Sequence, residues 1–279
     1  MIISEAFGFA FIHIPKCAGT TVREAIEPLD ESYERMTANL SQHPERPFTF
    51  SLDGRKTYAD FHHLTLRRLQ RYFPHELKRL NSLEVYALVR DPRKRLLSAV
   101  TQRLKQFAQI SVSDLSQEDL RSAMHRDLEE LDQIFQEGPD LPFEYIHFQP
   151  QSDYIELDGK AFSENVFTTD QIDQLEGALV KRVALNGGEV PPFAHAKANV
   201  AKVHRFAVVE RMVQANGWVK HAAKSLVPAP LKTAIKQVVY AERGNRYDQL
   251  LLDPFVTEFV ERHYARDSAI FDAARRGAS

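Results

Sequence analysis

Cysteine is almost absent from this sequence, which has one in 279 residues. A framework of disulfides within the chain is therefore excluded. The 11 histidines, among them His13, His43 and His75, are scattered along the chain. No group of cysteines and histidines has the spacing of a metal site, and so we predict no bound metal.

Long apolar runs are also missing, since no stretch approaches the about 20 residues that a membrane-spanning helix needs. The first residues enter an apolar strand without the basic segment and cleavage pattern of a secretory leader. The net charge is only −2, which gives no support for general binding to nucleic acid. These absences predict a cytoplasmic protein without a membrane span or a nucleic-acid partner.

What the sequence does contain is an alternation of apolar strand patterns with helical patterns. Hydrophobic residues make up 43% of the chain, which is ample for a substantial core. Strands are predicted over 8–14, 85–89 and 165–169. Helices are predicted over 20–28, 63–72, 93–108, 116–136, 170–184, 211–225 and 254–275. Such alternation is typical of an α/β fold with a central parallel sheet.

Three further stretches have a distinct composition. The polar segment 30–57, which contains Pro44 and Pro47, is predicted to be a loop that forms a lid over a substrate. The segment 138–162, with three prolines, is predicted to be irregular. From about residue 203 onward the pattern is helical, basic and amphipathic.

The most informative segment connects the first predicted strand to the first predicted helix. An apolar strand is followed there by Pro15, Lys16, Cys17, Ala18, Gly19, Thr20 and Thr21. A tight turn before a helix offers free backbone N–H groups at the positive end of the helix dipole, an arrangement that binds phosphate. Lys16 adds a movable charge, and the two threonines add hydroxyl donors. The lysine precedes the turn, whereas in the Walker motif it follows the glycines.

A second motif starts with the apolar strand that ends at Arg90. Pro92 opens the next helix, where its missing N–H costs nothing, and Ser98 lies about two turns further on. A helix that packs back against its strand can bring Ser98 close to Arg90. Because a guanidinium fork and a hydroxyl that converge suit a phosphate group, the sequence predicts a second anion site.

Together the two segments resemble the nucleotide-binding motifs of sulfotransferases that use 3'-phosphoadenosine 5'-phosphosulfate (PAPS), above all those that modify carbohydrates and proteins. The first resembles the family wording FxxIPKTAGTT, with Cys17 in place of threonine, and the second resembles RDPxxRxxSxY, with Val100 in place of tyrosine. The resemblance implies a P-loop-like, three-layer α/β fold with a central parallel sheet, as one domain over residues 1–279. The donor-binding core is expected at about 8–110, and a helical C-terminal part at about 203–279.

The resemblance also divides the donor between the motifs. Residues 15–21 are expected to hold the 5'-phosphosulfate, whereas Arg90 and Ser98 hold the 3'-phosphate. A later segment resembles family residues near the nucleotide, which implies that Lys197 covers the donor. The product would be 3'-phosphoadenosine 5'-phosphate (PAP), with no metal required. Family members of the eukaryotic Golgi carry a membrane anchor, and the lack of one here favours a bacterial protein over a chain cut from an anchored one.

The acceptor hydroxyl needs a general base, and the leaving oxygen needs a cation or proton donor. Lys16, beside the phosphosulfate, suits the second task. The segment 63–69 resembles the family wording HxTxxxI, which points to His63 as the base, with His62 as the alternative. Since some family members use a glutamate, three carboxylates stay open: Glu5, Glu24 and Asp60.

We therefore expect an enzyme that transfers a sulfuryl group from PAPS to a hydroxyl of a carbohydrate or small molecule by in-line displacement. One alternative is a P-loop-type small-molecule kinase, which would need carboxylates to hold Mg²⁺, and another is a catalytically silent nucleotide-binding protein. Five basic residues can together recognise an acidic glycan, although the preferred interpretation is that they lie on solvated faces of helices. They are Arg67, Arg68, Arg71, Arg103 and Lys105. The sequence does not fix the acceptor or the oligomeric state.

Overall fold

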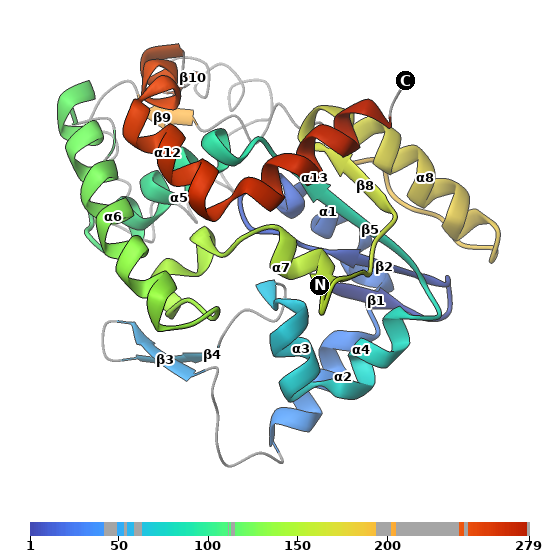
Figure 1. Cartoon of the computed structure of the whole chain (residues 1–279). Helices are drawn as coiled ribbons and strands as arrows, with labels where there is room; N and C mark the ends of the chain where they lie inside the picture. Colours follow the sequence, from blue (N-terminus) through green and yellow to red (C-terminus); the bar gives the residue numbers. More distant parts are fainter. Residues whose placement is uncertain are drawn as a thin grey trace, which may run out of the picture.

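Figure 1 shows the computed structural model of the chain. It describes residues 1–41, 49–52, 55–58, 63–110, 112, 115–193, 202–204, 240–242 and 245–277. A central sheet lies on one side of the molecule, and a group of long helices lies on the other (Figure 1).

Within the described residues, the central sheet has four strands in the order β1-β2-β5-β8. They span Ile2–Ser4, Phe9–Ile12, Glu84–Val89 and Asn165–Thr168. The last three run parallel, and β1 pairs antiparallel with β2. All of β2 and all of β5 except Glu84 are buried, as expected for parallel strands covered on both faces. The three predicted strands are confirmed, whereas β1 was not predicted.

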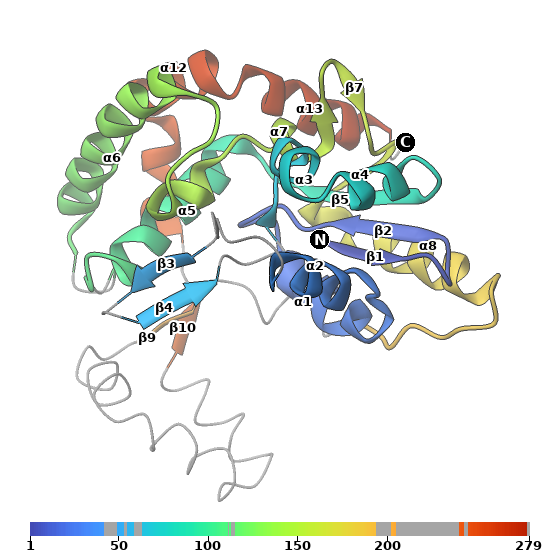
Figure 2. The same ribbon diagram turned by 90° about the horizontal axis from the view of Figure 1, so that it is seen from below.

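Helices cover both faces of this sheet (Figure 2). One face carries α1 (Gly19–Ile26), α2 (Ser32–Ser41) and α8 (Ile172–Ala184). The other carries α3 (Leu66–Tyr72), α4 (Pro74–Leu80), α7 (Ser152–Ile155) and α13 (Ala265–Arg276). The mixed α/β class with a mostly parallel sheet is therefore confirmed.

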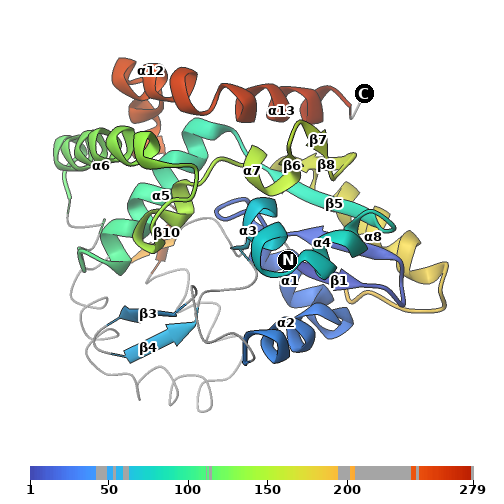
Figure 3. The ribbon, with the colours of Figure 1, turned by 60° about the horizontal axis from the view of Figure 1, so that its bottom comes forward.

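A second hydrophobic cluster lies beside the sheet core and is built mainly from helices. Its elements are α5 (Pro92–Gln106), α6 (Gln117–Glu137), η4 (Phe143–Phe148), η7 (Asn245–Leu252) and α12 (Pro254–His263). The helix predicted over 254–275 is divided, because α12 ends before Tyr264, whose buried hydroxyl donates to the carbonyl of Phe148 at 2.5 Å. Figure 3 shows α12 and α13 following one another along one side of the molecule.

Several predictions for irregular segments were wrong. The segment 30–57 contains α2 and the paired strands β3 (Thr49–Leu52) and β4 (Arg55–Tyr58). Asp30 organises the start of α2 by accepting from the amide of Ser32 at 2.9 Å, a local hydrogen bond that apolar periodicity does not reveal. The segment 138–162 contains η4, α7 and the pair β6 (Glu156–Leu157) with β7 (Lys160–Ala161).

The later part of the chain is also less uniform than predicted. Its described residues include an antiparallel pair, β9 (Lys202–His204) with β10 (Tyr240–Glu242), before the helices resume at Asn245. The helix predicted over 211–225 lies outside the described residues. Within the described ranges, no helix combines the length and the apolar character that crossing a bilayer requires.

Candidate active site

The turn between β2 and α1 has a strained backbone. Lys16 and Ala18 both have positive φ, 67° and 58°, a conformation that residues other than glycine adopt rarely. Left-handed residues alternating with others turn successive N–H groups toward one point and form an anion-binding concavity. Because strain of this kind collects at functional sites, the turn is the first candidate for the site.

Helix α1 begins at this turn without a side-chain cap. Ala18 occupies the N-cap position, and in the described part of the chain no side chain caps the first turn or places an acid there. The positive end of the helix dipole is therefore uncompensated, which favours an anion. Thr20 is exposed at this end, whereas Thr21 is buried, so only Thr20 presents its side chain to solvent.

The second motif converges on the same turn. Arg90 follows the end of β5, and its Nη1 donates to the carbonyl oxygen of Lys16 at 3.3 Å. Nζ of Lys16 donates to Oε1 of Gln102 in α5 at 3.4 Å. Ser98 precedes Gln102 by one helical turn and shares its face of α5. The structure therefore brings Lys16 and Arg90 together, and it turns the Ser98 face of α5 toward Lys16.

Buried Arg95, in the helix of the second motif, connects the two motifs by hydrogen bonds. Its side chain is only 2% exposed. Nε donates to the carbonyl of Pro15 at 3.1 Å, and Nη2 donates to the carbonyls of His147, at 3.1 Å, and Gln149. With the carbonyls of Pro15 and Lys16 bound by arginines, the turn does not present these acceptors to an anion. This role of Arg95 was not predicted from the sequence.

Gln151 holds the end of β5 against the turn. Its side-chain amide forms two hydrogen bonds with the backbone of Arg90. It accepts from the backbone N–H at 2.9 Å and donates to the carbonyl at 2.9 Å. It also accepts from the thiol of Cys17 at 3.2 Å. Asp267 in α13 accepts from the backbone N–H groups of Gln151, at 2.7 Å, and Ser152, at 2.9 Å. Helix α13 therefore supports the turn through a chain of buried hydrogen bonds.

Cys17 is a structural residue rather than a nucleophile. Its side chain is fully buried, and burial raises the pKa of the thiol to about 11. A thiol in that state stays protonated at neutral pH and acts as a donor, here toward Gln151. The cysteine in place of the family's threonine is therefore compatible with an intact turn.

Arg95→Met is expected to lower the free energy of unfolding by about 2–4 kcal/mol, because it leaves buried carbonyls without their charged partner. Chemical denaturation followed by circular dichroism measures the change. Lys94→Met, at an exposed position of the same helix, is the matched control and should stay within about 0.5 kcal/mol of the parent. Equal stability of the two variants would contradict the bridging role of Arg95.

Three histidines that are far apart in the sequence meet beside the turn. The ring of His63 lies edge-on to that of His13, with centroids 4.5 Å apart, and 6.1 Å from that of His147. His13 also packs on the helix start, since a Cβ added to Gly19 would lie 2.0 Å from its Cδ2. Residue 19 must therefore be glycine for this contact. The histidines were expected to be scattered, and their cluster was not predicted.

The structure also places some of the other residues that were predicted for the site. His63 lies before α3, not in it, because Thr65 caps that helix by accepting from the amide of Arg68 at 3.3 Å. Glu5 is in the β1–β2 turn, at the opposite end of β2 from Lys16, and pairs with Arg35 at 3.4 Å. It is therefore excluded as the base. Three candidates lie outside the described residues: His62, Asp60 and Lys197.

Two of the basic residues considered for glycan binding are engaged inside the protein. Arg68 donates to the carbonyl of Leu141 at 2.9 Å. Arg103 pairs with Asp127 at 2.7 Å and with Glu144 at 2.5 Å. The preferred interpretation, solvated helix faces, is therefore wrong for these two arginines, whose side chains are only 18% and 15% exposed.

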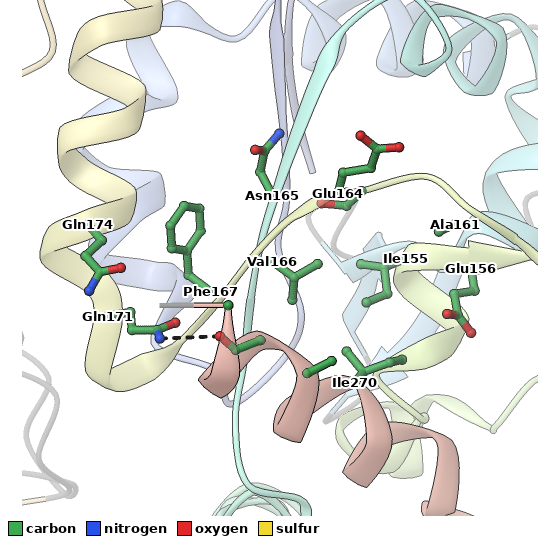
Figure 4. A pocket seen from close by; sticks show the side chains of 14 residues that line it. Ile155, Glu156, Ala161, Glu164, Asn165, Val166, Phe167, Gln171, Gln174 and Ile270 are labelled. Carbon is green, nitrogen blue, oxygen red and sulfur yellow. Dashed lines mark hydrogen bonds between the residues drawn. The ribbon is translucent and has the colours of Figure 1, made fainter. Parts of the chain in front are cut away.

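A pocket of about 420 Å³ lies elsewhere, along the edge strand β8 between α8 and α13 (Figure 4). Val166, Phe167 and Ile270 contribute apolar walls, and Gln171 donates across it to the carbonyl of Ala274 at 3.4 Å. Its lining includes no residue of the two anion motifs. Among the described residues, no group of three or more histidine, cysteine or acidic side chains could hold a metal ion.

Comparison with known proteins identifies the family of the chain. A family model described as the sulfotransferase family matches residues 1–175, which include the strained turn, Arg90, Arg95 and the histidine cluster. Comparisons with curated proteins and with solved structures find no match. The matched region is more than half of the sequence, and the chain belongs to the sulfotransferase family.

Proposed function

We propose that this protein transfers a sulfuryl group from PAPS to a hydroxyl group of a carbohydrate acceptor, within a P-loop-like fold. The observation that carries the proposal is the meeting of Lys16 and Arg90 at an uncapped helix start, with Nη1 of Arg90 3.3 Å from the Lys16 carbonyl. Two cations next to one set of backbone N–H groups suit a nucleotide with phosphate groups at both ends. The family supports the sulfuryl chemistry.

The residues of the chain divide the chemistry as follows. The N–H groups of the turn and Lys16 bind the 5'-phosphosulfate, and Arg90 with Ser98 binds the 3'-phosphate. His63 accepts the proton of the acceptor hydroxyl, whose oxygen forms the new bond to sulfur. The bond between sulfur and the 5'-phosphate oxygen breaks, and Lys16 stabilises the charge that grows on that oxygen.

The kinase alternative would need free carboxylates for Mg²⁺ next to the phosphates. Asp91, which follows β5 directly, is occupied as the cap of α5 and accepts from the amides of Arg93, at 2.9 Å, and Lys94, at 3.1 Å. Calorimetric titration of the protein with PAP, and separately with ATP and Mg²⁺, distinguishes the two functions. Binding of PAP supports the sulfotransferase, whereas binding of ATP with Mg²⁺ and not of PAP supports the kinase.

The acceptor is found by offering ³⁵S-labelled PAPS with a panel of hexoses, hexosamines, glycosaminoglycan chains and phenols. Label on a carbohydrate supports the proposed acceptor class, and label on phenols alone overturns it. Binding of PAP without transfer to any member of the panel would favour the silent nucleotide-binding alternative. The single domain over residues 1–279 and the cytoplasmic location stay predictions.

Arg90→Ala is expected to weaken PAP binding by about 1.5–3 kcal/mol, the range for hydrogen bonds to a charged group. The backbone should keep its place, because Gln151 holds both polar groups of the Arg90 peptide. Ser98→Ala should have a smaller effect. The control ligand is adenosine 5'-phosphosulfate, which lacks the 3'-phosphate and should lose little affinity. Equal losses for both nucleotides would show that Arg90 does not read the 3'-phosphate.

A further inference from the structure

We infer that His13 is a positioning residue. It holds the ring of the general base His63 in place beside the turn between β2 and α1 (the donor turn). The inference rests on the proposed function and extends it, because nothing in the two anion motifs explains how the base reaches the donor. His13 is 4% exposed and lies at the end of β2, two residues before Pro15.

The contacts of His13 connect the two halves of the site. One side of its ring packs on the backbone of Gly19, so closely that a Cβ there would lie 2.4 Å from its Nε2. The ring of His63 meets it edge-on at 4.5 Å, with an interplanar angle of 62°. Phe11, two residues earlier, stacks at 6.3 Å. His13 therefore fills the space between the start of α1 and the base.

His147 supports the arrangement from the other side of His63. Its ring lies 6.1 Å from that of His63 at an angle of 80°. Its carbonyl accepts from Arg95, the same guanidinium that binds the carbonyl of Pro15. Both residues next to His63 are thus connected to the donor turn, His13 by the packing of its ring on Gly19 and His147 by the hydrogen bond from Arg95 to its carbonyl.

This geometry matters because a base acts only within hydrogen-bond reach of the proton that it removes. A displacement of about 1 Å can cost about 10²-fold in rate. His63 precedes α3 and lies outside that helix, and the side chains that pack against its ring hold it in position. The ring of His13 is the nearer neighbour, with its centroid 4.5 Å from that of His63, and is therefore the main support of the His63 ring.

The test compares three substitutions at position 13. His13→Leu keeps an apolar side chain to preserve folding but removes the ring, His13→Phe keeps a ring, and His13→Ala removes both. We expect kcat with the best acceptor of the panel to fall at least 10-fold in the leucine and alanine variants. The phenylalanine variant should stay within about 3-fold of the parent, since the inferred contact depends on ring shape. His75→Ala, at an exposed position in α4, is the control and should leave kcat unchanged.

Two further measurements separate positioning from a general structural role. The Kd for PAP should change less than 2-fold in His13→Leu, because donor contacts are retained. The ¹H resonance of the His63 ring should shift in His13→Leu and return toward its parent position in His13→Phe, as expected for the loss and recovery of a neighbouring ring.

The outcomes are distinct. A kcat for His13→Leu within 2-fold of the parent, an unchanged His63 resonance, or a fall in kcat matched by an equal loss of PAP affinity would each overturn the role of His13. A parent protein that binds no PAP and transfers no label would instead overturn the proposed function, and this role with it. The His63 resonance reports the ring contact in either case.

Discussion

Lys16→Ala is expected to lower the turnover of sulfuryl transfer by about 10²–10³-fold, the effect of losing one preorganised electrostatic contact to a transition state. The ammonium of Lys16 lies beside the strained turn, where it donates to Oε1 of Gln102 at 3.4 Å. The loss should appear in kcat, because charge on the leaving oxygen develops only as the bond to sulfur breaks. Initial rates with labelled PAPS and the best acceptor of the panel measure it.

The fold should survive this substitution, since the Lys16 side chain is only partly buried. Lys78→Ala removes an exposed lysine from α4 and serves as the control for a change of net charge. Unfolding by denaturant shows whether the variants are equally stable. Near-normal turnover in folded Lys16→Ala would remove the lysine from the mechanism.

His63→Ala should abolish measurable transfer and leave the affinity for PAP unchanged, because the base faces the acceptor and not the donor. Neutral imidazole is the form that accepts a proton. The rate of the parent protein should therefore rise with pH as the base loses its proton and then level off.

His62→Ala, measured beside it, is the neighbouring variant that tests the assignment. Full activity in His63→Ala with loss in His62→Ala would move the role by one position. Full activity in both would point to a carboxylate. Glu24, exposed on α1, is then the described candidate, and Asp60 is the other.

The parallel core of the fold could be predicted because its strands are continuous apolar runs buried on both faces. The two anion motifs stood out for a related reason, since each joins such a strand to a helix within a few residues. The strand β1 was missed because its three residues, Ile2–Ser4, are too few to show a pattern. Helix α2 was missed because its start depends on the hydrogen bond from the amide of Ser32 to Asp30.

The support of the site could not be predicted, because it consists of contacts between distant segments. Nothing near Gln151 in the sequence indicates that its side-chain amide will bond to both backbone polar groups of Arg90, 61 residues away. The cluster of His13, His63 and His147 arises only when three segments fold together. The requirement for Gly19 follows from the His13 ring, which local turn chemistry does not indicate.

The hydrogen bonds that connect the turn to α13 have a consequence for the order of folding. Cys17 and Gln151 are 134 residues apart, and Gln151 and Asp267 are a further 116 apart. Contacts of such separation raise the contact order and form slowly, because the entropy of closing long loops is lost before the contacts compensate for it. During synthesis the donor turn emerges early but gains its last support only when Asp267 arrives. Until then the chain can have a formed sheet and still lack a finished anion site.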